Sequence, residues 1–367
     1  MNGEDQAFLT QQLITCIGNK RALLDFIGRG VDRVAGRVGR RRLDCSDLFS
    51  GSGVVARFLK SRSRYLYVND LERYAELANV CYLANRSVVD TPGLRRTYAD
   101  LKRRLESEPL RSGFITELYA PRSDRVIRAG ERVFYTRRNA RYLDTARRYI
   151  EELPERLRPF MLAPLLAEAS VHANTAGVFK GFYKNSSTGV GQFGGNNRDA
   201  LTRILGRIDL PFPVWSRFEC GVTVYREDAA GLAGRLPAHD LCYLDPPYNQ
   251  HPYGSNYFML NLIADYRRPE KLSPVSGIPA DWNRSPFNKP QEASAALAEL
   301  AASVQARFLL VSFNSEGFIS REKMTALLRR LGRVEILETR YNAFRGGRNL
   351  GNRGLHVKEY LYLVEKK

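Results

Sequence analysis

Residues that build metal centres and disulfide frameworks are scarce in this sequence, which has only five cysteines and four histidines among 367 residues. No two cysteines form a Cys-x-x-Cys pair, and four histidines give little material for a closed zinc site. The cysteine spacing does not indicate a disulfide framework either. We therefore expect no bound metal and no disulfides among Cys16, Cys45, Cys81, Cys220 and Cys242.

Long apolar runs are also missing. The first residues, MNGEDQAFLTQQLITCIGNKR, are polar and contain no apolar core of a signal peptide. No run elsewhere approaches the roughly 20 apolar residues that a membrane-spanning helix needs. The sequence therefore predicts a soluble, cytoplasmic protein without a membrane partner.

Acidic residues are outnumbered, with 57 Lys and Arg against 39 Asp and Glu, which leaves a formal net charge of +18. Such an excess suggests a polyanionic partner, because cations that neutralise phosphates release condensed counterions. An arginine-rich proteome or a need for solubility would give the same excess, so the charge alone does not decide. The hydrophobic content of 44% predicts a globular fold.

Short apolar runs followed by turn residues predict buried strands, and helical patterns separate many of them. This alternation predicts an α/β fold with a mostly parallel sheet covered on both faces. The last two strands are close in sequence, which favours an antiparallel hairpin at the sheet edge. The predicted strands are 43–49, 65–69, 222–225, 241–245, 308–313, 334–339 and 360–364, and the predicted helices include 54–60, 75–85, 291–306 and 321–331.

The alternation stops between residues 87 and 213. Residues 87–170 have a largely helical pattern rich in Arg and Glu, and residues 171–198 are rich in Gly, Asn and Ser. We interpret 87–213 as an inserted, mainly helical module. The sheet domain is then built from residues 1–86 and 214–367.

A glycine motif, Asp47-Leu-Phe-Ser-Gly-Ser-Gly53, follows the first predicted strand and precedes a predicted helix. Gly51 and Gly53 would let the chain turn tightly and approach a ligand. The spacing fits a nucleoside pocket, although an ordinary glycine turn would look the same. Asp70 ends the next strand about 20 residues later and could accept both hydroxyls of a ribose. It could equally serve as the N-cap of a helix.

The tetrapeptide Asp245-Pro-Pro-Tyr248 follows the buried run Leu-Cys-Tyr-Leu. Pro246 and Pro247 prevent a helix and remove two amide donors, so they predict a rigid, extended turn. The Asp245 carboxylate and a carbonyl there could both accept hydrogens from one amino group, and Tyr248 offers a flat face to a base. A purely structural turn is the alternative, but the glycine motif about 190 residues upstream favours function.

Together these motifs resemble the Dam-type (alpha-class, D12-like) DNA adenine methyltransferases that depend on S-adenosyl-L-methionine, including those of restriction–modification systems. The likeness covers nearly the whole chain, and Asp245–Tyr248 matches the family's catalytic tetrapeptide completely. Residues 16–21 resemble its N-terminal cofactor motif, 47–53 its glycine motif, and 312–317 and 359–363 its late strands. The motif order is that of the alpha class, and 87–213 lies where this class keeps its target-recognition module. The resemblance implies a Rossmann-like methyltransferase sheet.

The resemblance also implies roles for single residues. Lys20 would lie near the cofactor and pair with its carboxylate, Gly51 and Gly53 would bracket its methionine portion, and Asp70 would bind its ribose. Asp228 would accept from its adenine amino group, with Glu227 an equal candidate. Cys16 stands where the family often has an aromatic residue, and Leu244 where the family usually has an aromatic before the catalytic Asp. The implied cofactor site is completed by Asp47, Phe49 and Asp245.

The implied reaction is methylation of the exocyclic amino group of adenine in double-stranded DNA, with the target base flipped out of the duplex. Asp245 and the Pro246 carbonyl would hold the amino group, and Tyr248 would stack on the base. RNA adenine methylation and cytosine amino methylation are the alternatives, although cytosine enzymes more often carry Ser in place of Asp245. A third alternative is a DNA-binding protein without enzymatic activity, but the intact tetrapeptide and glycine motif argue against it. A cognate restriction endonuclease would be a functional partner.

Two basic segments are candidates for contact with DNA. Residues 174–198 combine cations for phosphates with amides that can read bases, and residues 345–353 place three arginines on a glycine-rich loop. Solvated surface loops would have the same composition. The candidate DNA-binding residues are Lys180, Lys184, Gln192, Asn196, Arg198, Arg345, Arg348 and Arg353.

Overall fold

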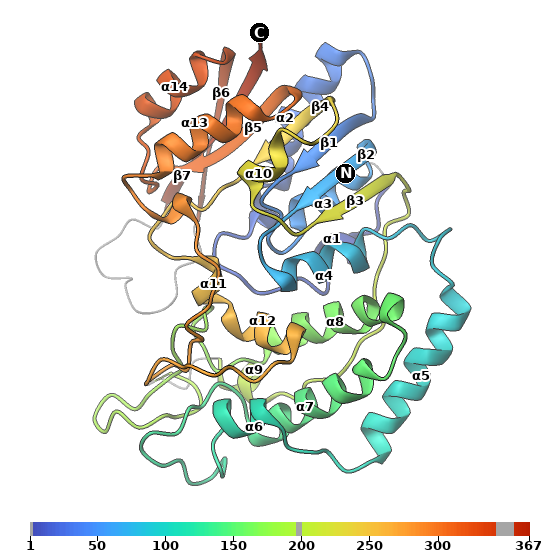
Figure 1. The fold of residues 1–367 in the computed structure, drawn as a ribbon, viewed down its shortest axis with the longest axis vertical. Helices are drawn as coiled ribbons and strands as arrows, with labels where there is room; N and C mark the ends of the chain where they lie inside the picture. The colour runs from blue at the N-terminus through green and yellow to red at the C-terminus, as the bar shows by residue number, and fades with distance from the viewer. Residues whose placement is uncertain (1–2, 196–199, 343–355) are drawn as a thin grey trace.

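The computed structural model describes residues 3–195, 200–342 and 356–367, which form a seven-stranded sheet with a helical layer below it (Figure 1). The strand order is β3-β2-β1-β4-β5-β7-β6. Strands β1 to β5 pair with one another in parallel, whereas β7 is antiparallel to both β5 and β6. The mostly parallel sheet and its antiparallel edge hairpin are therefore confirmed. The strands are β1 (Leu43–Asp47), β2 (Ser63–Asn69), β3 (Gly221–Tyr225), β4 (His239–Leu244), β5 (Ala306–Asn314), β6 (Gly332–Asn342) and β7 (His356–Lys366).

The central strands bury both faces, because their apolar residues run without polar alternation. In β4, Leu241 and Tyr243 belong to one buried cluster, and Cys242 and Leu244 to the other. Helices α2 (Leu24–Val38) and α3 (Val54–Lys60) cover the first face, and α10 (Ala229–Ala233), α13 (Ala293–Ser303) and α14 (Arg321–Arg329) the second. Every predicted strand and the predicted helix 54–60 are present.

The helix predicted over 291–306 is wrong at its end. Helix α13 stops at Ser303, and Val304 already has extended backbone angles (φ −59°, ψ 126°). Ala306 instead begins β5, where it pairs with His239 of β4. Alanine-rich composition favoured helix over the whole stretch, but parallel pairing in the sheet decides the conformation of the last residues.

A layer of helices lies below the sheet in Figure 1 and includes the described helices of residues 87–213. Helix α8 (Arg158–Val171) packs against α4 (Arg73–Tyr82) and α12 (Phe258–Asp265), so the layer shares the core of the sheet domain. The helical character of 87–170 agrees with the sequence pattern, and the module's limits stay a prediction. Remaining helices of the described chain are α1 (Gln6–Thr10), η1 (Lys20–Leu23), α5 (Thr91–Ser107), α6 (Phe114–Tyr119), α7 (Arg137–Glu151), η2 (Glu155–Leu157), α9 (Leu201–Leu205), α11 (Tyr253–Asn256) and η3 (Pro286–Asn288).

Among residues 3–195, 200–342 and 356–367, no helix combines the length and the apolar character needed to cross a membrane. The same residues contain no group of three His, Cys, Asp or Glu side chains arranged to hold a metal ion.

Candidate active site

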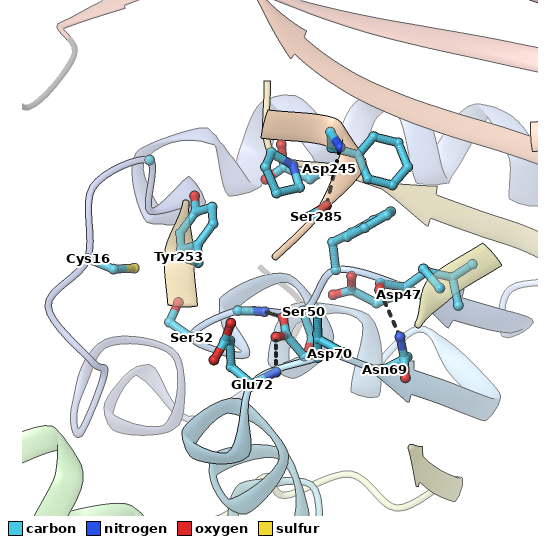
Figure 2. Close-up of a pocket in the computed structure, with 18 of the residues that line it drawn as sticks. Cys16, Asp47, Ser50, Ser52, Asn69, Asp70, Glu72, Asp245, Tyr253 and Ser285 are labelled. Carbon is cyan, nitrogen blue, oxygen red and sulfur yellow. Dashed lines mark hydrogen bonds between the residues drawn. The ribbon is translucent and has the colours of Figure 1, made fainter. Parts of the chain in front are cut away.

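A cavity opens at the carboxyl ends of β1, β2 and β4, and it encloses about 960 Å³ including its open mouth. Strand order reverses between β1 and β4, and ligands of open α/β sheets bind at such a switch point. Figure 2 shows Asp47, Asp70 and Asp245 facing this common space, with Cys16 and Tyr253 on its far side. The cavity therefore unites three motifs that are far apart in sequence.

The glycine motif forms one wall of the cavity. Gly51 and Gly53 both have positive φ, +52° and +77°, which residues with a Cβ rarely adopt. A Cβ at Gly53 would also come within 2.9 Å of Asn79 Oδ1. The side chain of Asn79 is held there, because its amide nitrogen donates to the Ser50 hydroxyl. The chain can make this tight turn into α3 only because glycine occupies both positions.

Asp47 is a fully buried carboxylate at the end of β1. Neither of its oxygens has a hydrogen-bond partner among the described residues. Burial raises its pKa well above the usual range, the charges of Asp245 and Asp70 add to the rise, and the nearby Phe49 amide opposes it. Because an unpaired buried carboxylate is costly, this geometry favours a cationic ligand in the cavity.

Asp70 connects two walls of the cavity. Its Oδ2 accepts from the Gly51 amide at 2.7 Å, and its Oδ1 accepts from the Glu72 amide at 2.9 Å. Asp70 is not the N-cap of α4, because Glu72 occupies that position, so the alternative role at the helix start is wrong. Each oxygen keeps further lone-pair capacity for hydroxyl donors.

The sequence analysis missed Glu72, whose carboxylate also lines the cavity. It accepts from the side-chain amides of Asn261 and Asn283, which come from beyond the tetrapeptide. Burial and the charge of Asp70 raise its pKa to about 7, while the two amides oppose the rise. Its position two residues after Asp70 was the only signal available in the sequence.

Phe49, Asp228 and Glu227 also line the cavity. Phe49 packs edge-on against Phe287, with ring centroids 5.2 Å apart. Glu227 forms an ion pair with Arg235. Asp228 caps α10 by accepting from two amides with Oδ1, and its Oδ2 is not part of this cap. Its second oxygen is thus the more available acceptor, since the Glu227 carboxylate is already paired.

Asp245 and Tyr248 leave β4 where the cavity meets the N-terminal segment. Lys20 Nζ lies 3.2 Å from Asp245 Oδ1 and 2.8 Å from Glu359 Oε1. It also lies 5.5 Å from the centre of the Tyr248 ring, which packs against Phe313 as well. Burial alone would lower the pKa of Lys20, but the two carboxylates outweigh it and raise that pKa well above its ordinary value. The lysine expected beside the cofactor's carboxylate thus has two protein carboxylates as partners.

The N-terminal segment around Cys16 closes one side of the cavity. The Ile17 amide donates to the Tyr257 hydroxyl at 2.7 Å, and a Cβ at Gly18 would lie 3.3 Å from the Tyr253 hydroxyl. Burial raises the pKa of Cys16 to about 11, so its thiol is neutral at physiological pH. Cys16 therefore acts as part of the wall and provides no aromatic stacking.

The described candidates for DNA contact lie outside the cavity. Lys180 and Lys184 are exposed, and Lys184 and Gly191 pair across a short hairpin-like turn. The Gln192 amide donates to the Gly194 carbonyl at 3.1 Å, which uses one of its donor hydrogens. The remaining candidates, Asn196, Arg198, Arg345, Arg348 and Arg353, lie outside the described residues.

With this geometry established, the chain can be compared with known proteins. The sequence profile of the D12 class N6 adenine-specific DNA methyltransferases matches residues 17–327. The chain is 29% identical to the type II methyltransferase M.NlaIII of Neisseria lactamica, over 95% of this chain and 98% of that protein. It is 29% identical to the type II methyltransferase M.CviAII of Paramecium bursaria Chlorella virus 1, over 95% and 97%. It is 26% identical to the modification methylase StsI of Streptococcus sanguinis, over 96% of this chain and 52% of that protein.

Proposed function

Since the chain belongs to the D12 class of N6 adenine-specific DNA methyltransferases, we propose that it takes its methyl group from S-adenosyl-L-methionine bound in the cavity between β1, β2 and β4. The protein methylates the exocyclic amino group of adenine at specific sites in DNA, and the target base is flipped out of the duplex. The finer class would be the adenine-specific site-specific DNA-methyltransferases. This family leaves no reason to favour the RNA or cytosine alternatives.

The unpaired carboxylate of Asp47 is the observation that carries the cofactor proposal. S-adenosylmethionine supplies a methyl group on a positively charged sulfur and carries a second positive charge on its ammonium group. A buried carboxylate without a partner suits such a cation, and a charged hydrogen bond there is worth about 1.5–3 kcal/mol. Asp70 would accept the ribose hydroxyls, and Asp228 the adenine amino group. The glycine motif leaves room for close approach.

Asp245 and the Pro246 carbonyl would accept the two hydrogens of the target amino group. The amino nitrogen is a poor nucleophile, because its lone pair is delocalised into the adenine ring. Two acceptors favour a pyramidal nitrogen, and their fixed position aligns it with the methyl group. Asp245 would also stabilise the positive charge that develops on the nitrogen. Tyr248 would replace the lost base stacking, which is worth about 1–3 kcal/mol.

Residues 87–213 would select the target sequence, with the segment 174–198 reading bases. Support comes from the exposed lysines of the short turn and from the break in strand–helix alternation. The relatives named as type II methyltransferases or modification methylases suggest a role in a restriction–modification system with a cognate endonuclease. The proposal includes a cytoplasmic location, as the sequence analysis expects.

Transfer of a labelled methyl group tests the donor. Purified protein mixed with duplex DNA and methyl-labelled S-adenosylmethionine should move the label to DNA. The demethylated product, S-adenosylhomocysteine, should compete for the same cavity. The duplex should contain every short sequence, so that the unknown recognition site is present. Absence of label in such DNA would contradict the proposed donor.

A further inference from the structure

A buried cluster of three charges lies beneath the tetrapeptide. Lys20 is 4% exposed and contacts both Asp245, 17% exposed, and Glu359, 1% exposed. Lys20 and Asp245 both line the cavity, whereas Glu359 is in β7 and does not line it. The three residues are contributed by the N-terminal segment, the end of β4 and the edge hairpin.

The sheet holds Glu359 in this position. Glu359 pairs in register with Asn314 of β5 and Thr339 of β6. The Ser312 hydroxyl donates to Glu359 Oε1 at 2.6 Å, the same oxygen that contacts Lys20. Its Oε2 is buried without a hydrogen-bond partner among the described residues. A carboxylate in a buried strand is costly, and a single cation and one hydroxyl do not satisfy it fully.

The net charge of the cluster depends on Glu359. Lys20 carries +1, and Asp245 and Glu359 carry −1 each when ionised, so the three together carry −1. Lys20 and Asp245 alone would form a neutral pair. A neutral pair stabilises a developing positive charge on the target nitrogen much less than a cluster with one net negative charge.

We propose that Glu359 is a positioning residue for methyl transfer: it holds Lys20 against one oxygen of Asp245 and leaves the cluster with one net negative charge toward the target amino group. Lys20 orients the Asp245 carboxylate, and Glu359 prevents the lysine from cancelling its charge. The inference rests on the role proposed above for Asp245.

The protonation of Asp245 reports on this arrangement. Burial raises its pKa to about 6, Lys20 opposes the rise, and Glu359 adds to it. Loss of the Glu359 charge should therefore lower this pKa, and loss of the Lys20 charge should raise it further. The other titratable groups that act on Asp245 or feel its charge are Cys16, Asp47, Tyr243, Tyr248, Tyr253 and Tyr341.

The same neighbouring groups are present in wild type and in every variant. Burial raises the pKa of Tyr248 and Tyr253 above their ordinary values, so both are neutral near pH 6, as is Cys16. Asp47 titrates with a raised pKa and is present in every variant. A change of midpoint at Asp245 on substitution of Glu359 therefore reflects the loss of that one charge.

The test is a pH titration of Asp245 in the free enzyme. The protein is labelled with ¹³C at the aspartate carboxyl carbon, and Asp245→Asn identifies the signal. Wild type should titrate near pH 6, Glu359→Gln at lower pH, and Lys20→Gln at higher pH. Glu365→Gln, the same substitution near the end of β7, should leave the midpoint unchanged. An unchanged midpoint in Glu359→Gln would overturn the proposal.

Kinetics give the second readout. Glu359→Gln should lower kcat by roughly tenfold to a hundredfold, less than the loss of a direct donor to the reacting charge. The acid limb of its pH profile should move to lower pH with the Asp245 midpoint, and KM for DNA should change little. Wild-type kcat with an unmoved acid limb would contradict the proposal.

Glu359→Asp keeps the charge on a shorter arm and covers the case in which Glu359→Gln does not fold. It should raise the Asp245 midpoint toward that of Lys20→Gln and lose kcat, because the negative charge remains while Lys20 is no longer held against Asp245. Wild-type kcat in this variant would refute the positioning role. These outcomes are distinct from failure of the proposed function, in which Asp245→Asn itself would remain active.

Discussion

The substitution Asp47→Asn separates ligand binding from fold stability, because it should change the two in opposite directions. In the free protein the Asp47 carboxylate is buried without a partner, and its pKa is well above the usual range. The folded state thus binds a proton more tightly than the unfolded state. The stability of wild type should therefore fall as pH rises from about 4, the unfolded value, toward the raised folded value. Asp47→Asn should remove this loss.

The same substitution should weaken S-adenosylmethionine binding. Loss of one charged hydrogen bond costs about 1.5–3 kcal/mol, which is roughly a tenfold to 150-fold rise in Kd. A cation that binds next to Asp47 should also release its proton. Calorimetry in buffers of different ionisation enthalpy measures that release. Asp47→Asn should release fewer protons than wild type, and the rest should come from Glu72 and other raised groups.

A matched control is available on the same strand. Asp44 lies at the start of β1, away from the cavity, and forms an ion pair with Arg64. Asp44→Asn should leave Kd and proton release as in wild type. If Asp47→Asn binds the cofactor within twofold of wild type with the same proton release, the assignment of Asp47 to a cationic ligand is refuted.

Three further predictions concern other residues of the site and module. Asp245→Ala should abolish methyl transfer while duplex binding, measured by fluorescence anisotropy, stays largely intact; turnover within tenfold of wild type would exclude the proposed role. Asp70→Ala should weaken the binding of S-adenosylmethionine by about 1.5–3 kcal/mol for each lost hydrogen bond, and should weaken DNA binding much less. Unchanged cofactor affinity in calorimetry would reject the assignment of Asp70 to the ribose. Lys184→Ala should weaken binding to all duplexes alike and reduce the salt slope, whereas Gln192→Ala should relax discrimination at one base pair by about 1–3 kcal/mol. Methylation of a randomised duplex library by each variant shows which sequences it recognises. If replacement of residues 174–195 leaves the methylated sequence unchanged, recognition lies elsewhere.

Strands were predictable from the sequence because each is a short apolar run that ends in turn residues. The order of the strands, and the insertion of β7 between β5 and β6, depend on pairing between distant segments. Local patterns contain no such information. The helix predicted over 291–306 extended too far for the same reason, since composition favours a helix at Ala306 but pairing with β4 makes it extended.

The motif residues of the site were predictable because glycine turns and the Asp245–Tyr248 turn have distinctive local chemistry. Their partners were not. Glu359 lies inside an apolar strand, and only the fold brings it to Lys20. Asn283 reaches Glu72 from more than 200 residues away. A charged residue within a buried strand is the one signal that could have drawn attention to Glu359.

The most direct test of the central claim is the identity of the methylated base. Duplex DNA is treated with wild type or Asp245→Asn in the presence of S-adenosylmethionine, and its nucleosides are separated by mass spectrometry. We predict N6-methyladenine with wild type and none above background with Asp245→Asn. Methylated cytosine, or N6-methyladenine at wild-type levels with Asp245→Asn, would contradict adenine methylation through Asp245.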